Sequence, residues 1–133
     1  TDRVAQVMGN GSHGSTFGGN PLSTRVGCEV LDIVSAPEFL SGVEAKGKKL
    51  RAGLETLRGD FPTLISEVRG PGLMIGLELK QDAKGIVPLL QKHGMLAITG
   101  SANSLRVYPS LNISDPEIEQ ALDIFRAAFN DAT

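Results

Sequence analysis

The sequence predicts an α+β fold, in which a small and mostly antiparallel sheet carries helices on one face. Helical and β-like patterns follow one another in the order α, α, β, β, α, β, β, α. The β-like segments come in two pairs, and a short glycine-containing turn joins the members of each pair, which is typical of hairpins. A hairpin-based sheet buries its apolar face under helices, so both kinds of element belong to one α+β layer structure.

The first half of the chain predicts two helices. Asn20 is a favourable N-cap residue, and Pro21 suits the first helical position. Pro37 would break this helix and can open the next one, which we expect to end at residues 59–60. Glycines inside the second helix each cost about 1 kcal/mol relative to alanine. Apolar residues recur at helical spacing in both helices: Leu22, Val26, Val30, Ile33 and Val34, then Phe39, Val43, Leu50, Leu54 and Leu57.

The second half of the chain predicts four strands and two helices. The strands are expected at residues 64–68, 73–79, 95–99 and 105–108, with a short helix over residues 81–93 between the two pairs. The strand at 73–79 is apolar almost throughout, which favours a central position in the sheet. The last helix has the clearest start, because Ser114 and Glu117 have the spacing of a capping box. A boundary near residues 35–37 would divide the chain into a loop and helix, residues 1–36, and a compact remainder, residues 37–133.

The composition excludes several classes of partner. The chain has 13 basic and 15 acidic residues and a net charge of −2, which gives no reason to expect nucleic acid or an anionic membrane as a partner. No apolar run approaches the ~20 residues of a membrane span. Cys28 is the only cysteine, so no internal disulfide is expected, and a cytoplasmic location fits. We expect Cys28 to be a small buried apolar residue. Two distant histidines and one cysteine do not predict a metal site.

The segment at residues 10–21, NGSHGSTFGGNP, carries the most specific chemical signal. Its glycines permit close backbone approach to a ligand, and its hydroxyl groups and backbone N–H groups can bind an anion such as a phosphate. It is not a Walker A loop, because no Gly-Lys-Ser/Thr follows. The alternative is a connector whose glycines only form tight turns.

Three basic side chains need separate interpretations. Arg106 lies in a short apolar strand, so it either meets an anion or extends its head into water from the strand edge. Arg69 precedes a Gly-Pro-Gly turn, where we expect a structural salt bridge. We expect the ring of His13 to hold the glycine-rich loop by hydrogen bonds rather than to act as an acid or base.

Three segments together resemble the class III (ornithine-type) pyridoxal-phosphate aminotransferases. They are residues 13–22 (HGSTFGGNPL), 68–79 (VRGPGLMIGLEL) and 105–114 (LRVYPSLNIS), in the order in which the family has them near its C-terminus. Among the members, the acetylornithine aminotransferases look most similar. The resemblance implies that residues 1–36 come from the end of a large cofactor domain. Residues 37–133 would be the small C-terminal domain of a fold-type I enzyme that depends on pyridoxal phosphate.

The resemblance also implies roles for three residues. Thr16, with Ser15 beside it, would contact the phosphate of pyridoxal 5'-phosphate bound by the other subunit of a homodimer. Arg106 would bind a substrate carboxylate. The expected reaction moves an ω-amino group from acetylornithine to 2-oxoglutarate in arginine biosynthesis. Ornithine, succinylornithine and 4-aminobutyrate are alternative donors.

No catalytic residue is assigned within the chain. The family places its Schiff-base lysine before the Ser-Thr loop, and no lysine here follows a strand in that context. We therefore expect this chain alone to be inactive, as the C-terminal portion of a longer enzyme. The alternative from a different class is a non-catalytic α+β module that binds a ligand.

Overall fold

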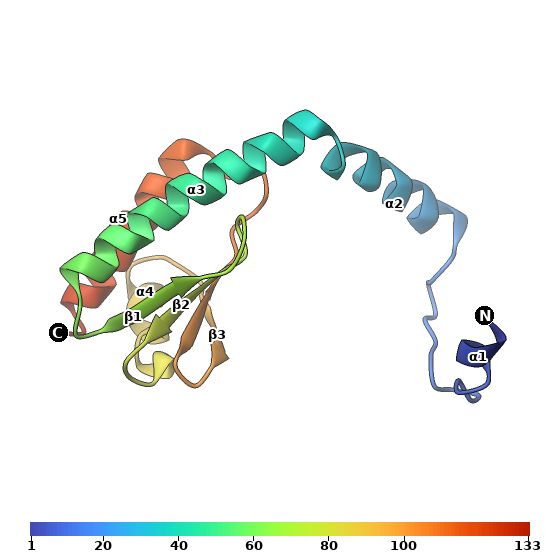
Figure 1. Ribbon diagram of the computed structural model, residues 1–133, viewed down its shortest axis with the longest axis horizontal. Helices are drawn as coiled ribbons and strands as arrows, with labels where there is room; N and C mark the ends of the chain where they lie inside the picture. The colour runs from blue at the N-terminus through green and yellow to red at the C-terminus, as the bar shows by residue number, and fades with distance from the viewer. The chain divides into compact units, whose positions relative to one another are not determined.

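The computed structural model describes all residues, 1–133, and they form two compact units (Figure 1). The first unit comprises residues 1–39 and the second residues 40–133. The division falls near the start of α3, which spans Pro37–Asp60. Each unit is described by itself below.

The first unit contains two helices and the glycine-rich loop between them. Helix α1 spans Asp2–Ala5 and α2 spans Pro21–Val34. The side chain of Asn20 accepts a hydrogen bond from the backbone N–H of Ser23 at 3.0 Å, and Pro21 occupies the first helical turn, which confirms the predicted start. No residue of α2 is buried. The expectation that Cys28 is buried is wrong: it is exposed, because the apolar side of α2 meets no partner within the unit.

The second unit contains a four-stranded sheet with the order β1-β2-β4-β3. Its strands are β1 (Ile65–Arg69), β2 (Ile75–Leu79), β3 (Ile98–Ser101) and β4 (Ser104–Val107). All three neighbouring pairs are antiparallel, as predicted. Strands β2 and β3 run parallel to each other because each is antiparallel to β4. The central position of β2 also agrees with its apolar sequence, since its residues alternate between buried and half-buried.

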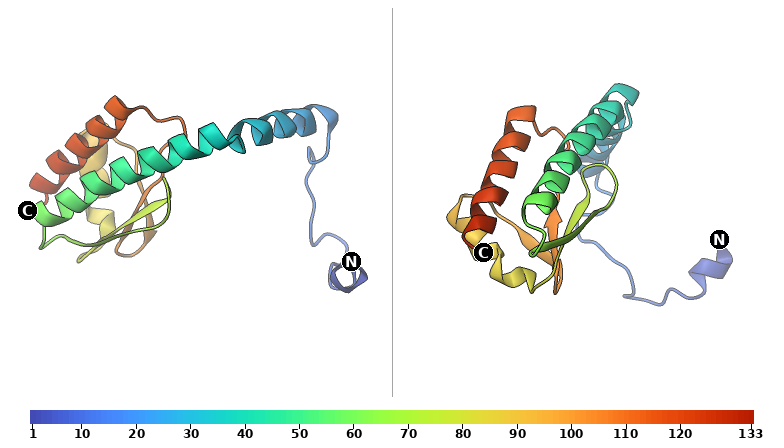
Figure 2. Two further views of the ribbon diagram at one scale, coloured as in Figure 1. Left: turned by 45° about the horizontal axis from the view of Figure 1, so that its top comes forward. Right: turned by 60° about the vertical axis from the view of Figure 1, so that its left-hand side comes forward.

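Helices α3 and α5 (Asp115–Asn130) lie side by side on one face of the sheet (Figure 2). One continuous core joins that face to the helices, and the opposite face remains open. The fully buried residues of this core include Leu50, Leu54 and Leu57 of α3, Phe125 and Phe129 of α5, and Ile75, Leu77 and Leu105 of the sheet. The predicted α+β layer with helices on one face is therefore confirmed.

Two glycines of α3 mark places where the helix approaches other elements closely. A side-chain carbon at Gly47 would lie 2.6 Å from the backbone of Gly72, in the turn between β1 and β2. A side-chain carbon at Gly53 would lie 2.2 Å from Leu122 of α5. Any larger residue would push these elements apart. The close packing therefore offsets the low helix propensity of glycine at both positions.

The helix expected over residues 81–93 is shorter than predicted. A 3₁₀ helix spans Ala83–Gly85 and α4 spans Val87–Lys92. Pro88 explains the break, because a residue without a backbone N–H fits only the first turn of an α-helix. The following strand begins at Ile98 rather than at residue 95.

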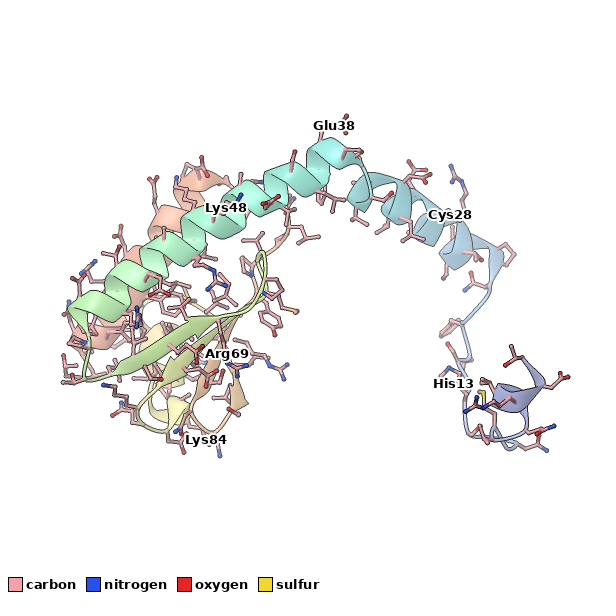
Figure 3. The ribbon with its side chains drawn as sticks, in the orientation of Figure 1. His13, Cys28, Glu38, Lys48, Arg69 and Lys84 are labelled. Carbon is pink, nitrogen blue, oxygen red and sulfur yellow. The ribbon has the colours of Figure 1, made fainter.

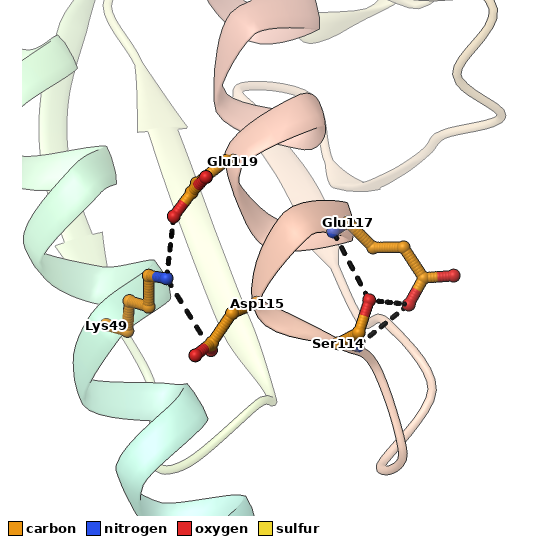
Figure 4. A network of polar contacts seen from close by, with 5 residues as sticks. All are labelled: Lys49, Ser114, Asp115, Glu117 and Glu119. Carbon is orange, nitrogen blue, oxygen red and sulfur yellow. Dashed lines mark hydrogen bonds and ion pairs between the residues drawn. The ribbon is translucent and has the colours of Figure 1, made fainter.

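Helix α5 begins with the predicted capping box (Figure 4). The backbone N–H of Ser114 donates to the Glu117 carboxylate at 2.7 Å, and the N–H of Glu117 donates to the Ser114 hydroxyl. The bond from the Ser114 N–H, together with one from the Ser114 hydroxyl to the same carboxylate oxygen, holds the pKa of Glu117 below its usual value. Lys49 of α3 reaches Glu119 at 2.8 Å and Asp115 at 3.6 Å, which ties the same end of α5 to its neighbouring helix.

Candidate functional site

The glycine-rich loop of the first unit is built around a tight turn between Ser15 and Gly18. The N–H of Gly18 donates to the carbonyl of Ser15 at 3.3 Å. A side-chain carbon at Gly18 would come within 2.8 Å of the Ser15 β-carbon, so only glycine fits here without a shift. Asn20 closes the loop by donating to the carbonyl of Phe17 at 2.5 Å. The turn thus places Ser15 and Thr16 at its tip, just ahead of α2.

The tip of this loop has the donors that a phosphate requires. Both Ser15 and Thr16 are exposed, and neither hydroxyl makes a hydrogen bond within the chain. Residues 3–28 contain no aspartate or glutamate, so no carboxylate opposes an anion here. Hydroxyl and backbone N–H donors on a glycine-rich turn suit phosphate oxygens. The residues present therefore fit the phosphate group of pyridoxal 5'-phosphate.

The predicted role of His13 is not met in this structure. The residue lies in the loop and is exposed (Figure 3), but its ring makes no hydrogen bond within the chain. The shape of the loop comes instead from backbone bonds and from the side chains of Ser12 and Asn20.

Arg106 lies on the open face of the sheet in the second unit. It is an exposed residue of β4, paired with Gly76 on β2 and with Ile98 on β3. Its neighbours Leu105 and Val107 point into the core. The alternation of the strand therefore directs Arg106 away from the helices and leaves its guanidinium accessible.

The charge of Arg106 is not neutralised within the chain, whereas that of Arg69 is. Arg69, at the end of β1 (Figure 3), donates to the Glu78 carboxylate from Nε at 2.8 Å and from Nη2 at 2.7 Å. This is the structural salt bridge expected for Arg69. The side chain of Arg106 has no ion pair or hydrogen bond. An unpaired guanidinium is the group that a carboxylate or another anion would meet on this face.

A hollow of about 390 Å³ surrounds Arg106 on the open face. Its lining contains both arginines and several small residues: Arg69, Gly70, Pro71, Met74, Gly76, Gly100, Ser101, Ser104, Arg106 and Tyr108. The stem of Arg106 lies over Gly100, where an added side-chain carbon would be 3.4 Å from its Cγ. The small residues leave room for a ligand of a few heavy atoms beside the guanidinium.

Sequence reasoning did not identify Glu78, Ser104 and Tyr108 as neighbours of this site. Strand alternation could have placed each of them on one face of its own strand. This alternation does not show which strands pair. The register of β2 with β4 places Glu78 opposite Ser104 and Gly76 opposite Arg106. Thr16 and Ser15 belong to the first unit and Arg106 to the second, so the structure presents two separate candidate sites.

The structure offers no other obvious functional centre. No group of three or more histidine, cysteine, aspartate or glutamate side chains could hold a metal ion. None of its helices combines the length and apolar character that crossing a membrane demands. The six lysines are all outside the buried core, and Lys48, Lys49 and Lys92 are each held by a carboxylate.

Comparison with known proteins gives consistent relatives. The model of the family "Aminotransferase class-III" matches residues 1–129. The mitochondrial acetylornithine aminotransferase of Yarrowia lipolytica is 37% identical over 131 residues, which are 98% of this chain and 32% of that protein. The acetylornithine aminotransferase of Mesorhizobium japonicum is 39% identical over 127 residues, 96% of this chain and 32% of that protein.

Solved structures agree with the sequence relatives. A lysine aminotransferase from M. tuberculosis in the internal aldimine form superimposes with a TM-score of 0.81 at 29% identity, covering 99% of this chain and 31% of that one. The N-acetylornithine aminotransferase from Stenotrophomonas maltophilia K279a gives a TM-score of 0.78 at 35% identity, covering 86% of this chain and 32% of that one.

The chain spans about a third of the length of the curated relatives that it matches. The similarity covers almost the whole chain, from the glycine-rich loop to the last helix. The three segments that resemble this family in the sequence lie within the matched residues. This chain belongs to the class III aminotransferases.

Proposed function

We propose that this chain is the C-terminal portion of a pyridoxal-phosphate-dependent N2-acetylornithine:2-oxoglutarate 5-aminotransferase. The observation that carries the proposal is the unpaired guanidinium of Arg106, on an open sheet face, in a chain whose loop presents the free hydroxyls of Ser15 and Thr16. The names of its relatives favour acetylornithine as the amino donor.

Thr16 and Ser15 are the proposed ligands of the cofactor phosphate. Their hydroxyls and the N–H groups of the loop would hold the phosphate, and α2 would fix the loop through the Asn20 cap. The phosphate would belong to the other subunit of a homodimer, so that cofactor binding and subunit association support each other. When bound, pyridoxal phosphate supplies the reactive carbonyl carbon that takes up and returns the amino group.

Arg106 is the proposed ligand of a substrate carboxylate. A guanidinium can donate two parallel N–H bonds to one carboxylate, which fixes both the position and the orientation of a dicarboxylate such as 2-oxoglutarate. The stem of Arg106 lies over Gly100 of β3, beside the hollow that would receive the substrate. Arg106 thus orients the keto group without taking part in proton transfer.

The choice of amino donor is tested with the full-length enzyme. We expect kcat/KM for acetylornithine to exceed the values for ornithine, succinylornithine, 4-aminobutyrate and lysine, with 2-oxoglutarate as acceptor. A clear preference for one of the other donors would replace acetylornithine in the proposal. Absence of turnover with every donor, in protein that holds its cofactor, would favour a non-catalytic ligand-binding module instead.

The proposed location is the cytoplasm. Fungal relatives carry the word mitochondrial in their names, whereas the bacterial ones carry no such word. Fractionation of the native cells, followed by detection of the full-length protein, tests this part of the proposal.

A further inference from the structure

Two arginines flank a single glycine on the open face of the sheet. Gly76 of β2 is paired with Arg69 on β1 and with Arg106 on β4, so the three residues form one row across three strands. Because Gly76 has no side chain, no side chain within this row separates the stems of the two arginines. The space above Gly76 is therefore open to a side chain from the next row of the sheet.

Glu78 occupies that space. It lies two residues after Gly76 on β2, on the same face, and its side chain is only 17% exposed. A side-chain carbon built at Gly76 would be 3.4 Å from the Glu78 Oε1, which places this carboxylate oxygen directly above the glycine. By register, Glu78 is a diagonal neighbour of Arg69 on one side and of Arg106 on the other. Long side chains reach each other across such diagonals.

The carboxylate is held entirely on the Arg69 side. Both Nε and Nη2 of Arg69 donate to the Glu78 Oε1, at 2.8 and 2.7 Å, and no bond joins Glu78 to Arg106. If Arg69 did not hold it, Arg106 on the neighbouring strand would be an unpaired cation within diagonal reach of this carboxylate. A carboxylate of the protein that paired with Arg106 would compete directly with a substrate carboxylate.

We propose that Arg69 is a positioning residue for anion binding. By holding Glu78, it keeps that carboxylate away from Arg106 and leaves the Arg106 guanidinium available for a dicarboxylate substrate. This inference rests on the proposed function of Arg106. It adds Arg69 as the residue that determines how accessible the Arg106 guanidinium is to a substrate. The ion pair thus acts on substrate affinity through Glu78, without touching the substrate.

The first test observes Arg106 directly in the 133-residue chain. The NMR signal of its Nε–Hε group reports whether a carboxylate binds it. We expect Arg69→Met to move this signal, because Glu78 then turns to Arg106, and we expect Arg69→Met/Glu78→Gln to return it to the wild-type position. Arg58→Met is the matched control, since it breaks the ion pair with Glu55 on α3 and leaves Glu78 untouched.

The second test measures steady-state kinetics of the full-length enzyme. Arg69→Met should raise KM for 2-oxoglutarate by about threefold to fivefold, the range expected for competition by a partly exposed ion pair, and leave kcat nearly unchanged. The double variant should restore the wild-type KM. Arg69→Lys keeps one cation beside Glu78, so it should give a smaller rise.

The outcomes separate this inference from the proposed function. An Arg106 signal that moves no more in Arg69→Met than in Arg58→Met would overturn the positioning role of Arg69. So would a KM that rises in Arg69→Met and is not restored by Glu78→Gln. If Arg106→Lys leaves KM unchanged while the NMR signal behaves as expected, the substrate role of Arg106 fails and its competition with Glu78 stands.

Discussion

At the scale of single residues, Arg106 is the position where the sequence and the structure point to the same chemistry. The residue lies between two buried neighbours on the strand, and its guanidinium has no ion pair, so it is available to an anion from outside the chain. Arg106→Lys keeps the charge but loses the two-bond fork, which should cost about 1.5–3 kcal/mol. We expect kcat/KM of the full-length enzyme with 2-oxoglutarate to fall by roughly tenfold or more. Arg126→Lys, which alters an arginine of α5 paired with Asp60, is the control, and an unchanged value in Arg106→Lys would make the residue structural.

Thr16 provides the second prediction at this scale. Thr16→Val removes the hydroxyl at nearly constant volume, and one lost bond to a charged acceptor is worth about 1.5–3 kcal/mol. The Kd of the full-length enzyme for pyridoxal phosphate should therefore rise roughly tenfold or more, with less dimer in sedimentation. Thr56→Val is the control, because its hydroxyl bonds only to the carbonyl of Ala52 in α3. Cofactor affinity equal to the wild type would assign Thr16 to the scaffold.

At the scale of elements, α5 depends on its capping box. Ser114→Ala removes the acceptor for the N–H of Glu117 and should lower the free energy of unfolding by about 1 kcal/mol. Urea denaturation of the 133-residue chain measures this change. Ser101→Ala, at an exposed serine whose side chain makes no hydrogen bond, should leave the unfolding free energy almost unchanged. Equal effects of the two substitutions would contradict a role for the cap.

The end of α5 carries a pH-dependent contact with the end of α4. Asp131 accepts bonds from Lys92 at 2.8 Å and from His93 at 2.9 Å, and these hold the pKa of its carboxyl below its ordinary value of 3.8. A carboxyl group whose pKa is lower in the folded protein than in the unfolded chain contributes to stability. This contribution is complete above the ordinary pKa and is lost as the pH falls through the folded-state pKa. Asp131→Asn should therefore weaken the loss of stability that the wild type shows as the pH falls below about 4. Asp123→Asn, at an aspartate of α5 without an ion pair, should retain the wild-type acid transition measured by circular dichroism.

The sequence was sufficient to predict features that depend on residues a few positions apart. It was insufficient to predict features that depend on packing between distant segments. The caps at Asn20 and Ser114 were predictable because donor and acceptor lie three residues apart. The spacing of Gly47 and Gly53 indicated only a weak helix, since their contacts with Gly72 and Leu122 come from elsewhere in the chain. Cys28 was misjudged for a related reason, because a residue on a partly apolar helix is buried only if another element covers it.

The candidate site shows the same limit. The sequence identified Arg106 and the Ser15-Thr16 loop from residue type and local context. The pairing of Glu78 with Arg69 depends on the register of β1 with β2, which no short pattern encodes. Sequence reasoning therefore found Arg106 and the Ser15-Thr16 loop and missed the carboxylate of Glu78 beside Arg106.

At the scale of the whole molecule, the surroundings of the lysines bear on whether this chain alone could carry out aminotransfer. Aminotransfer needs a lysine that bonds covalently to the cofactor and later moves a proton, with its amine desolvated or otherwise activated. All six lysines lie outside the buried core, and three form ion pairs with Glu44, Glu119 and Asp131. None of them lies in the glycine-rich loop or among the residues that line the hollow around Arg106.

We therefore expect the isolated 133-residue chain to have no aminotransferase activity. The purified chain is mixed with pyridoxal phosphate, acetylornithine and 2-oxoglutarate, and glutamate formation is followed over time. The rate should equal that of free pyridoxal phosphate with the same substrates, because Thr16 and Arg106 can bind anions but cannot transfer a proton. The full-length enzyme is the positive control. Turnover by the chain above the free-cofactor rate would contradict the prediction, and substitution of each of the six lysines by methionine would then show which one acts.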